Sequence, residues 1–232
     1  SINAAHTFTF LPKKEDPGFA AVSDKSVLSY YTIVENSFYA SQLLFACCYL
    51  HDKYFKIIIL RIFGDKLNKN NSRLPVLVTG ATGYIASWVV KYLLEKGHTV
   101  HATVRDISDN GKKSHLDKIA SDCNGELKYF EADLLKPSSY KEAMADCQFV
   151  FHIASPFIMD SKDPQKEIID PALEGTKNVL KSVNETSSVK RVVLTSSVAA
   201  IYGDGIDSKN VPDGIFDETM WNTSSTPTMG EY

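Results

Sequence analysis

The feature that most constrains the fold of this chain is a strand, a glycine turn and a helix in direct succession over residues 75–97. Val76, Leu77 and Val78 form a short apolar run, which is typical of a central strand in a parallel sheet. After the turn, the apolar positions change from a period of two to the 3.6 of an amphipathic helix. Gly97 then stands where a helix C-cap is expected.

The turn between this strand and helix has the composition of an anion-binding loop. Gly80 and Gly83 allow a tight bend and a close approach of the backbone to a pyrophosphate. The first turn of the helix adds N–H groups and the positive end of the helix dipole. Ala86 takes the place of a third glycine and still permits close packing of the helix on the strand. An ordinary strand–turn–helix, with glycines for geometry alone, stays open as an alternative at this point.

Composition places the chain among ordinary globular proteins. Of its 232 residues, 44% are hydrophobic and 23% are charged, and this length suits one domain, alone or with an extension. The net charge of -3 at pH 7 offers no basic face, so we expect no nucleic acid among the partners.

Four cysteines stand at irregular spacing: Cys47, Cys48, Cys123 and Cys147. This spacing fits neither a disulfide framework nor a zinc site, so we expect no metal. Buried thiols in a reducing compartment are the simplest interpretation, and we expect a cytoplasmic location.

Residues 1–73 do not share the pattern of the rest of the chain and form an N-terminal extension of unassigned structure. The apolar stretch at 38–50 is interrupted at 51–53, well short of the ~20 apolar residues that a membrane span requires. It also lies far from Ser1, so it does not have the layout of a signal peptide. We therefore expect no membrane partner, and we interpret the polar residues 66–72 as a linker.

Three origins of this extension stay open: a genuine extension, a degraded interaction segment, or translated sequence that is not part of the natural protein. The last is favoured, because the phosphate-binding strand is usually the first element of a domain of this kind. The chain also begins with Ser1 rather than Met and stops at Tyr232 within an expected loop. We therefore expect both ends to be those of a partial reading frame.

From residue 74 onward, strands and helices are expected to alternate. The expected strands are 76–78, 98–104, 127–130, 148–153 and 191–195, with short helices at 112–120 and 138–145. A longer helix is expected before the last strand, with one face formed by Ile169, Leu173, Thr176, Leu180 and Val183. Alternating βα units of this length predict an α/β fold with a doubly wound parallel sheet, in which ligands bind beyond the carboxyl ends of the strands.

A cation follows the second strand of this sheet. The guanidinium of Arg105 can pair with the 2′-phosphate of NADP and stack on adenine, whereas NAD is normally met there by Asp or Glu. NADP is therefore favoured as the cofactor, although Asp106 keeps NAD open and Arg105 as a mere surface residue is the alternative. Lys112 or Lys113 could supply a second cation.

Polar or small residues also follow the third and fourth strands. Asp133 could accept a hydrogen bond from the adenine amino group, or it could simply cap the next helix. Ala154 and Ser155 are small at the point where backbone passes the ribose and nicotinamide. His152, inside the fourth strand, is interpreted as a packed core histidine rather than a catalyst.

Three hydroxyl residues end the fifth strand: Thr195, Ser196 and Ser197. A hydroxyl at this edge can hydrogen-bond a substrate carbonyl oxygen and stabilise the charge that develops on it. The alternative is that Ser196 and Ser197 only end the strand and cap the local backbone. A nucleophilic role is not favoured, since Ser197 lacks the glycine pattern of a nucleophile elbow.

Taken together, these stretches resemble the extended short-chain dehydrogenase/reductases, and within them the dihydroflavonol reductase and cinnamoyl-CoA reductase-like branch. The matching stretches are 79–86, 103–106, 151–156, 162–164, 174–176 and 195–197, within a region that covers 74–232. The resemblance implies a Rossmann fold that binds NADP and an enzyme that reduces a small-molecule carbonyl, an aldehyde or ketone, to an alcohol.

The resemblance also implies roles for individual residues. The cofactor-binding positions that it implies are Thr79, Gly80, Thr82, Gly83, Tyr84, Ile85, Arg105, Asp133, Leu134, Ala154, Ser155 and Thr195. Ser197 matches the serine of the family's catalytic Ser–Tyr–Lys set, and Tyr232 fits the place of its tyrosine. Tyr202 is too near Ser197 for the family spacing, and Tyr232 as a mere terminal residue is the alternative.

The family's lysine would follow Tyr232 by four residues, after the printed sequence. We therefore expect an NAD(P)-binding domain at 74–232, truncated before the catalytic lysine and the substrate domain, that is inactive as given. An NAD-dependent epimerase, a hydroxysteroid-type dehydrogenase and a non-catalytic dinucleotide-binding relative stay open as alternatives. Substrate identity and oligomeric state are left undetermined.

Overall fold

The computed structural model describes residues 6–12, 31–32, 74–156, 158 and 161–201, together with 203, 207, 209, 211, 214, 216 and 220–226. Two tyrosines considered from the sequence, Tyr202 and Tyr232, lie outside the described residues.

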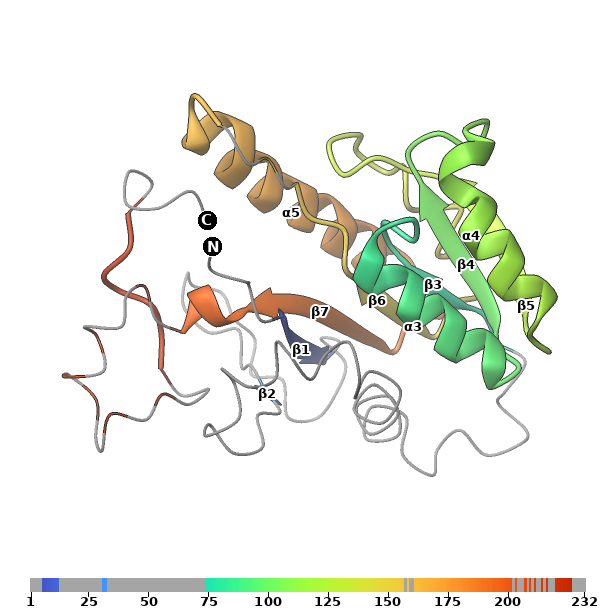
Figure 1. Ribbon diagram of the computed structural model, residues 1–232, viewed down its shortest axis with the longest axis horizontal. Helices are drawn as coiled ribbons and strands as arrows, with labels where there is room; N and C mark the ends of the chain where they lie inside the picture. Colours follow the sequence, from blue (N-terminus) through green and yellow to red (C-terminus); the bar gives the residue numbers. More distant parts are fainter. Residues whose placement is uncertain are drawn as a thin grey trace.

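Five parallel strands form the centre of the molecule (Figure 1). They are β3 (Val76–Val78), β4 (Thr99–Val104), β5 (Glu126–Glu131), β6 (Phe149–His152) and β7 (Arg191–Ser197). Their order in the sheet is β5-β4-β3-β6-β7, and every neighbouring pair among them is parallel. The chain therefore changes direction across the sheet at β3, as expected of a doubly wound Rossmann fold, and the sequence prediction is confirmed.

Helices connect these strands. They are α3 (Tyr84–Glu95), α4 (Asn110–Ser121) and α5 (Asp170–Glu185), with a π-helical segment η3 (Gln165–Ile169) before α5 and a 3-10 turn η4 (Val198–Ala200) after β7. The first helix ends as its sequence predicts, because Gly97 takes a left-handed φ of 79° and its N–H donates to the Leu94 carbonyl over 2.9 Å.

Two further strands extend the sheet beyond β7. The strand β1 (His6–Pro12) runs antiparallel to β7 along its whole length, with His6 opposite Ser197 and Pro12 opposite Arg191. The short strand β2 (Tyr31–Thr32) then pairs with β1. Part of the N-terminal extension is thus a continuation of the central sheet.

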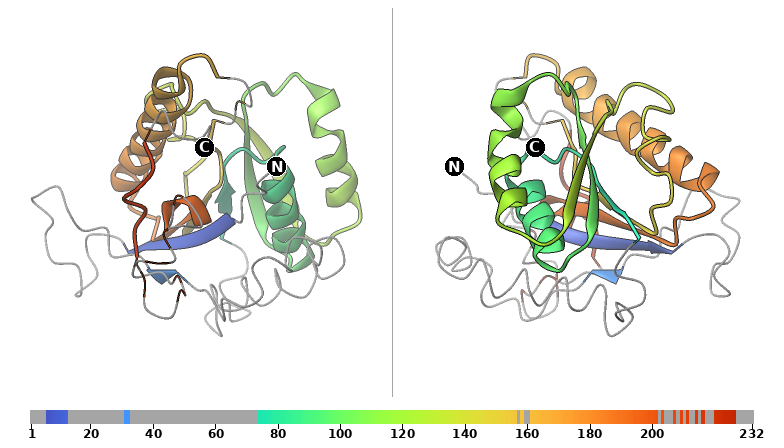
Figure 2. Two further views of the ribbon diagram at one scale, coloured as in Figure 1. Left: turned by 60° about the vertical axis from the view of Figure 1, so that its left-hand side comes forward. Right: turned by 90° about the vertical axis from the view of Figure 1, so that its right-hand side faces the viewer.

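The helices cover both faces of the sheet (Figure 2). On β3, Val76 and Val78 belong to the core beneath α3 and α4. Leu77, between them, belongs to the opposite core, where it packs with Val179 and Val183 of α5. All three strand residues are at most 1% exposed, so β3 is buried on both faces, as its continuous apolar sequence predicts.

The helix α5 forms where the sequence predicts a long helix, and the predicted face is buried only in part. Its buried residues are Gly175, Val179, Ser182 and Val183, whereas Leu173 of the predicted face is 52% exposed. A Cβ at Gly175 would lie 2.9 Å from the Leu134 Cβ, so α5 approaches the loop after β5 too closely for a larger side chain. Val183 of the predicted face is buried and Leu180 packs against the core, so periodicity alone predicted this face only in part.

The segment expected as a helix at 138–145 is instead a series of turns. Ser138 and Asp146, at its two ends, have left-handed φ values of 63° and 62°, which interrupt a helical backbone. The side chains of Tyr140 and Met144 are buried in the core beneath α5. The burial of these two side chains holds the segment against the sheet without a regular helix.

One glycine gives a test of the packing between α3 and β4. A Cβ on Gly125 would lie 2.5 Å from the His98 carbonyl oxygen and 2.7 Å from the Leu94 Cα, both of them backbone atoms. We expect Gly125→Ala to lower the free energy of unfolding by about 1–3 kcal/mol, measured by urea denaturation.

Gly111→Ala is the matched control, because the nearest atom to a Cβ at Gly111 in α4 is 3.4 Å away. Alanine there is expected to be neutral or to stabilise the protein by up to about 1 kcal/mol. Equal stability of the two alanine variants would contradict this account of Gly125.

Candidate functional site

The glycine turn after β3 has the close backbone approach that its sequence predicts. Gly80 has a φ of 63°, and a Cβ there would lie 3.0 Å from the Ala154 Cβ in the segment after β6. At Gly83, which begins α3, a Cβ would lie 3.2 Å from the Gly80 carbonyl oxygen. Gly80 is therefore favoured by its left-handed φ and by the approach of Ala154, whereas a side chain at Gly83 would need the Gly80 carbonyl to shift by a few tenths of an ångström.

A buried threonine hydroxyl joins this turn to β6. The Oγ1 of Thr79 accepts hydrogen bonds from the backbone N–H groups of Ile153, over 3.0 Å, and Ala154, over 2.9 Å. The same oxygen lies 3.0 Å from the Nδ1 of His152. Thr79 is fully buried, so its side chain holds the site together from inside the protein, and a contact between Thr79 and the cofactor stays a prediction.

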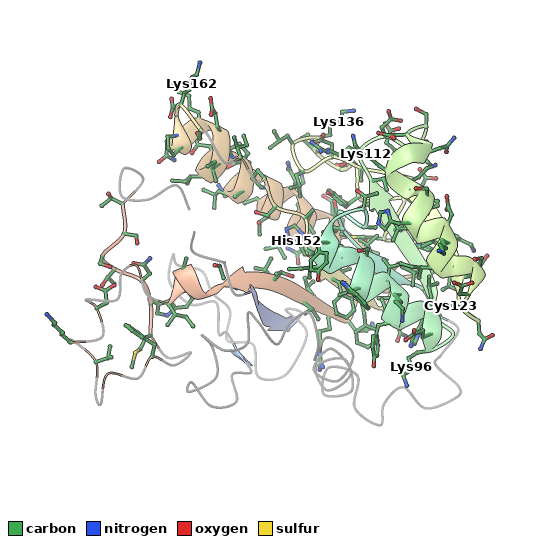
Figure 3. The ribbon with its side chains drawn as sticks, viewed as in Figure 1. Lys96, Lys112, Cys123, Lys136, His152 and Lys162 are labelled. Carbon is green, nitrogen blue, oxygen red and sulfur yellow. The ribbon has the colours of Figure 1, made fainter. Side chains whose placement is uncertain are left out.

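The ring of His152 completes this network in its neutral form (Figure 3). Because the Thr79 oxygen already accepts two N–H groups, its own proton is donated to His152 Nδ1 and the ring proton is on Nε2. Burial lowers the pKa of His152 to about 4, which keeps the ring neutral at physiological pH. His152 is 1% exposed, as expected of a core histidine.

A second buried threonine holds the other side of the turn. The Oγ1 of Thr103, in β4, accepts a hydrogen bond from the Gly80 N–H over 3.2 Å. The Thr103 carbonyl oxygen accepts from the Ala81 N–H over 3.0 Å. The sequence analysis did not single out Thr103, and its signal was only a hydroxyl near the end of a strand.

The N-terminus of α3 faces this turn without a side-chain cap. Its N-cap is Gly83, and its first turn contains no acidic residue. By contrast, α4 is capped by Asp109, whose carboxylate accepts from the Lys112 N–H. The positive end of the α3 dipole is therefore not neutralised by its own side chains, which favours an anion at the turn.

A pocket of about 310 Å³ lies beside the turn. It is lined by Thr82, Val104, Arg105, Asp106, Asp109 and Lys112. The fold thus brings together the glycine turn, the end of β4 and the first turn of α4. This is expected, because ligands of such folds bind beyond the carboxyl ends of the parallel strands.

Both carboxylates of this pocket have protein partners. Asp106 Oδ1 accepts from the N–H of Ser108 over 2.8 Å and from its hydroxyl over 2.6 Å, and these hydrogen bonds lower the pKa of Asp106. Asp109 caps α4 and pairs with the Nζ of Lys112 over 3.1 Å. Within the described residues, no acceptor pairs with the exposed guanidinium of Arg105. Arg105 is therefore available to an incoming anion.

The structure separates the two neighbouring lysines. Lys112 is exposed and lines the pocket, whereas Lys113 is only 8% exposed and donates to the Ile107 carbonyl oxygen. Of the two cations considered from the sequence, Lys112 is the one placed beside Arg105.

The loop after β5 is held by local hydrogen bonds. Asp133 Oδ1 accepts from the Leu135 N–H over 2.8 Å, and the hydroxyl of Ser139 bonds both the N–H and the carbonyl of Asp133. The Leu134 carbonyl accepts from Asn178 of α5 over 2.8 Å. The carboxylate of Asp133 therefore shapes its own loop, and its contact with adenine stays a prediction.

The carboxyl end of β7 presents hydroxyl groups. The Oγ1 of Thr195 is buried and has no hydrogen-bond partner within the described residues. The Oγ of Ser197 accepts from the Ala199 N–H over 3.2 Å, which is the local capping that the sequence allowed. Asn222, which the sequence analysis missed, donates to the Ala199 carbonyl over 2.8 Å and brings residues 220–226 to this strand end.

These observations fit a dinucleotide phosphate group. Gly80 and Gly83 leave two positions of the turn without side chains, and α3 directs an uncapped N-terminus at it. Among the described residues, no three His, Cys, Asp or Glu side chains gather closely enough to hold a metal ion. In the same part of the chain, no helix is both long and apolar enough to cross a bilayer.

Comparison with known proteins agrees with this geometry. The NAD dependent epimerase/dehydratase family matches residues 76–232. A cinnamoyl-CoA reductase of Medicago truncatula is 48% identical over 159 residues, which are 68% of this chain and 48% of that protein. A dihydroflavonol 4-reductase of Gerbera hybrida is 40% identical over 154 residues, 66% of this chain and 40% of that protein.

Some of the solved structures that are similar to this chain contain a bound nucleotide. Gre2 of Candida albicans in complex with NADPH is 34% identical, with a TM-score of 0.56 over 66% of this chain and 45% of that one. The yeast methylglyoxal/isovaleraldehyde reductase Gre2, also complexed with NADPH, is 30% identical, with a TM-score of 0.55 over the same shares. This chain spans about half the length of the curated relatives that it matches.

The Thr79 network predicts a stability effect. Thr79→Val keeps the shape of the side chain but leaves His152 Nδ1 and the N–H groups of Ile153 and Ala154 without their partner. We expect the free energy of unfolding to fall by about 2–4 kcal/mol, measured by urea denaturation.

Thr79→Ser is the matched control, since it keeps the hydroxyl and loses only a methyl group, at a cost of about 1 kcal/mol. A valine variant as stable as the serine variant would show that the hydroxyl does not hold this part of the site.

Proposed function

Because the chain belongs to the NAD dependent epimerase/dehydratase family, we propose that it is the NADP-binding part of a reductase that converts an aldehyde or ketone to an alcohol. The observation that carries this proposal is the pocket beside the glycine turn, where the Arg105 guanidinium is available and both carboxylates have protein partners. The likeness to reductases, two of them solved with NADPH, supports it.

In this proposal the turn and the pocket bind different phosphates. The pyrophosphate lies on the N-terminus of α3, against the backbone of residues 80–85. The 2′-phosphate lies in the pocket, where Arg105 and Lys112 supply two cations from different elements. Asp133 and Leu134 border the adenine, and Ala154, Ser155 and Thr195 line the path toward the nicotinamide.

NADPH, when bound, supplies the hydride that reduces the carbonyl carbon of the substrate. The chain contributes the hydroxyl of Ser197, whose proton is available to the carbonyl oxygen because the Ala199 N–H occupies only a lone pair of Oγ. By resemblance to the family, Tyr232 donates the proton that completes the alcohol. Its acidity would come from a lysine beyond the printed sequence.

The remaining assignments follow the same resemblance. Residues 74–232 act as the nucleotide-binding domain, residues 1–73 are an extension to it, and the partner is a small carbonyl compound. Cys123 and Cys147 are free thiols, and burial raises the pKa of Cys147 to about 12, which suits a structural thiol in the reducing cytoplasm.

One observation favours a second candidate. Asp106 lines the same pocket as Arg105, and a carboxylate at this place can accept the 2′-hydroxyl of NAD. An NAD-dependent epimerase or dehydrogenase on this scaffold would use Asp106 and leave Arg105 in solvent.

Cofactor choice separates these candidates. In the 232-residue chain, we expect Arg105→Ala to weaken NADPH binding about 10- to 100-fold, because a charge-assisted phosphate contact is lost. NADH binding should change by less than about threefold. Titration of nucleotide fluorescence measures both dissociation constants.

Lys96→Ala is the control, since Lys96 is an exposed cation at the opposite end of α3 (Figure 3). It should leave both constants unchanged. If Arg105→Ala weakens NADPH and NADH equally, the arginine does not recognise the 2′-phosphate and the NAD candidate is favoured.

Turnover is expected to need more than the printed sequence. We expect the purified 232-residue chain to bind NADPH without reducing an aldehyde faster than the uncatalysed background. The reason is that the family resemblance implies a lysine after Tyr232 and a substrate-binding part, while this chain spans only about half the length of its relatives. The reaction is followed by the loss of NADPH absorbance at ~340 nm. Steady oxidation of NADPH that depends on both the chain and the aldehyde would refute this expectation.

A further inference from the structure

Two consecutive lysines of α4 face different surroundings. Lys112 is exposed and lines the pocket, at the N-terminal end of the helix (Figure 3). Lys113 is 8% exposed, and its ammonium donates to the carbonyl oxygen of Ile107. The same ammonium lies 5.0 Å from the centre of the Tyr129 ring in β5. The charge of Lys113 is therefore directed into the protein, away from the solvent.

A buried ammonium requires compensating partners, because it has lost most of its hydration. Here the partners are one carbonyl oxygen and the face of an aromatic ring. The ring is itself fixed, since the Tyr129 hydroxyl donates to Asp117 Oδ1 over 2.7 Å, and Asp117 lies one turn after Lys113 on α4. An aliphatic side chain at this position would pack without the loss of hydration, but it would leave the Ile107 carbonyl without this donor. The cation thus has a use beyond packing.

That use is found in the loop between β4 and α4. Residues 105–109 carry three of the pocket-lining groups, Arg105, Asp106 and Asp109. The hydrogen bonds from Ser108 to Asp106 and from Lys112 to Asp109 are local, within four residues along the chain. The Lys113 contact is different, because it connects Ile107, in the middle of the loop, to Tyr129 on the sheet.

We propose that Lys113 is a positioning residue for the recognition of the 2′-phosphate, through its hydrogen bond to the Ile107 carbonyl and its contact with the Tyr129 ring. It holds the backbone two residues after Arg105 and so keeps that guanidinium at the pocket. Lys113 does not touch the nucleotide. The inference rests on the proposed function, which places the 2′-phosphate in this pocket.

The test compares nucleotide preference in variants of the 232-residue chain. Lys113→Met keeps the length of the side chain and removes the donor and the charge. We expect it to weaken NADPH binding about tenfold and NADH binding less than twofold, so the preference for NADPH falls by about a factor of five or more. The preference is the ratio of the dissociation constant for NADH to that for NADPH. Lys113→Arg keeps a cation and a donor, so it is expected to restore at least half of the lost preference, measured on the logarithm of this ratio.

Lys118→Met is the matched control, because Lys118 is an exposed cation on the same helix and the substitution removes the same charge. It should leave the preference unchanged, which separates loss of the contact from loss of positive charge on α4. A merely structural role of Lys113 would weaken both nucleotides alike, and this result would overturn the proposal, as would an unchanged preference.

Two further measurements keep the outcome decisive. If Lys113→Met does not fold, Tyr129→Leu removes the ring contact instead, and it must lower the preference for NADPH or the proposal fails. Arg105→Ala is measured in parallel. If Arg105→Ala lowers the preference and Lys113→Met does not, the role of Lys113 is refuted and the proposed function stands. If Arg105→Ala has no effect on the preference, the phosphate does not lie in this pocket and both proposals fall.

Discussion

The hydroxyl of Thr79 is the interaction on which the rest of the site depends. One oxygen atom receives the N–H groups of Ile153 and Ala154 and gives its proton to His152. These bonds bring the segment after β6 against the turn after β3, and the contact is so close that Gly80 can carry no side chain. The position of the glycine turn and the hydrogen bonding of a buried histidine therefore depend on the same oxygen atom.

The charged groups around this turn differ in whether they have hydrogen-bond partners within the protein. The carboxylates of Asp106 and Asp109 are satisfied by donors within their own loop, and Lys113 is turned inward to the sheet. Arg105 has none of these partners, so the net effect of the local hydrogen bonds is a cation presented beside an uncapped helix end. The selectivity of such a pocket for an anion depends on the paired carboxylates of Asp106 and Asp109 as much as on the Arg105 guanidinium.

Much of this arrangement could be predicted from the sequence, because it follows from local patterns. Apolar runs locate the strands, the glycine turn locates the helix, and the rule for strand ends places Thr82 and Arg105 in one region. The buried face of α5 was predicted only in part, since Gly175 lies on it against Leu134, and these two residues are distant in sequence. The same applies to Lys112 and Lys113, whose opposite directions depend on where β5 places the Tyr129 ring.

The pairing of β1 with β7 has a consequence for how the chain can fold. Residues 6–12 pair with residues 31–32 on one side and with residues 191–197 on the other, so the outermost parallel strand and its antiparallel neighbour come from opposite ends of the described chain. During synthesis, β1 can pair with β2 early, but its longer pairing with β7 must wait until most of the polypeptide has left the ribosome. Pairings of such high contact order form slowly, and an unpaired strand can meet the same strand of another molecule in the meantime. The pairing of β1 with β7 is therefore a step of assembly that depends on protein concentration during folding.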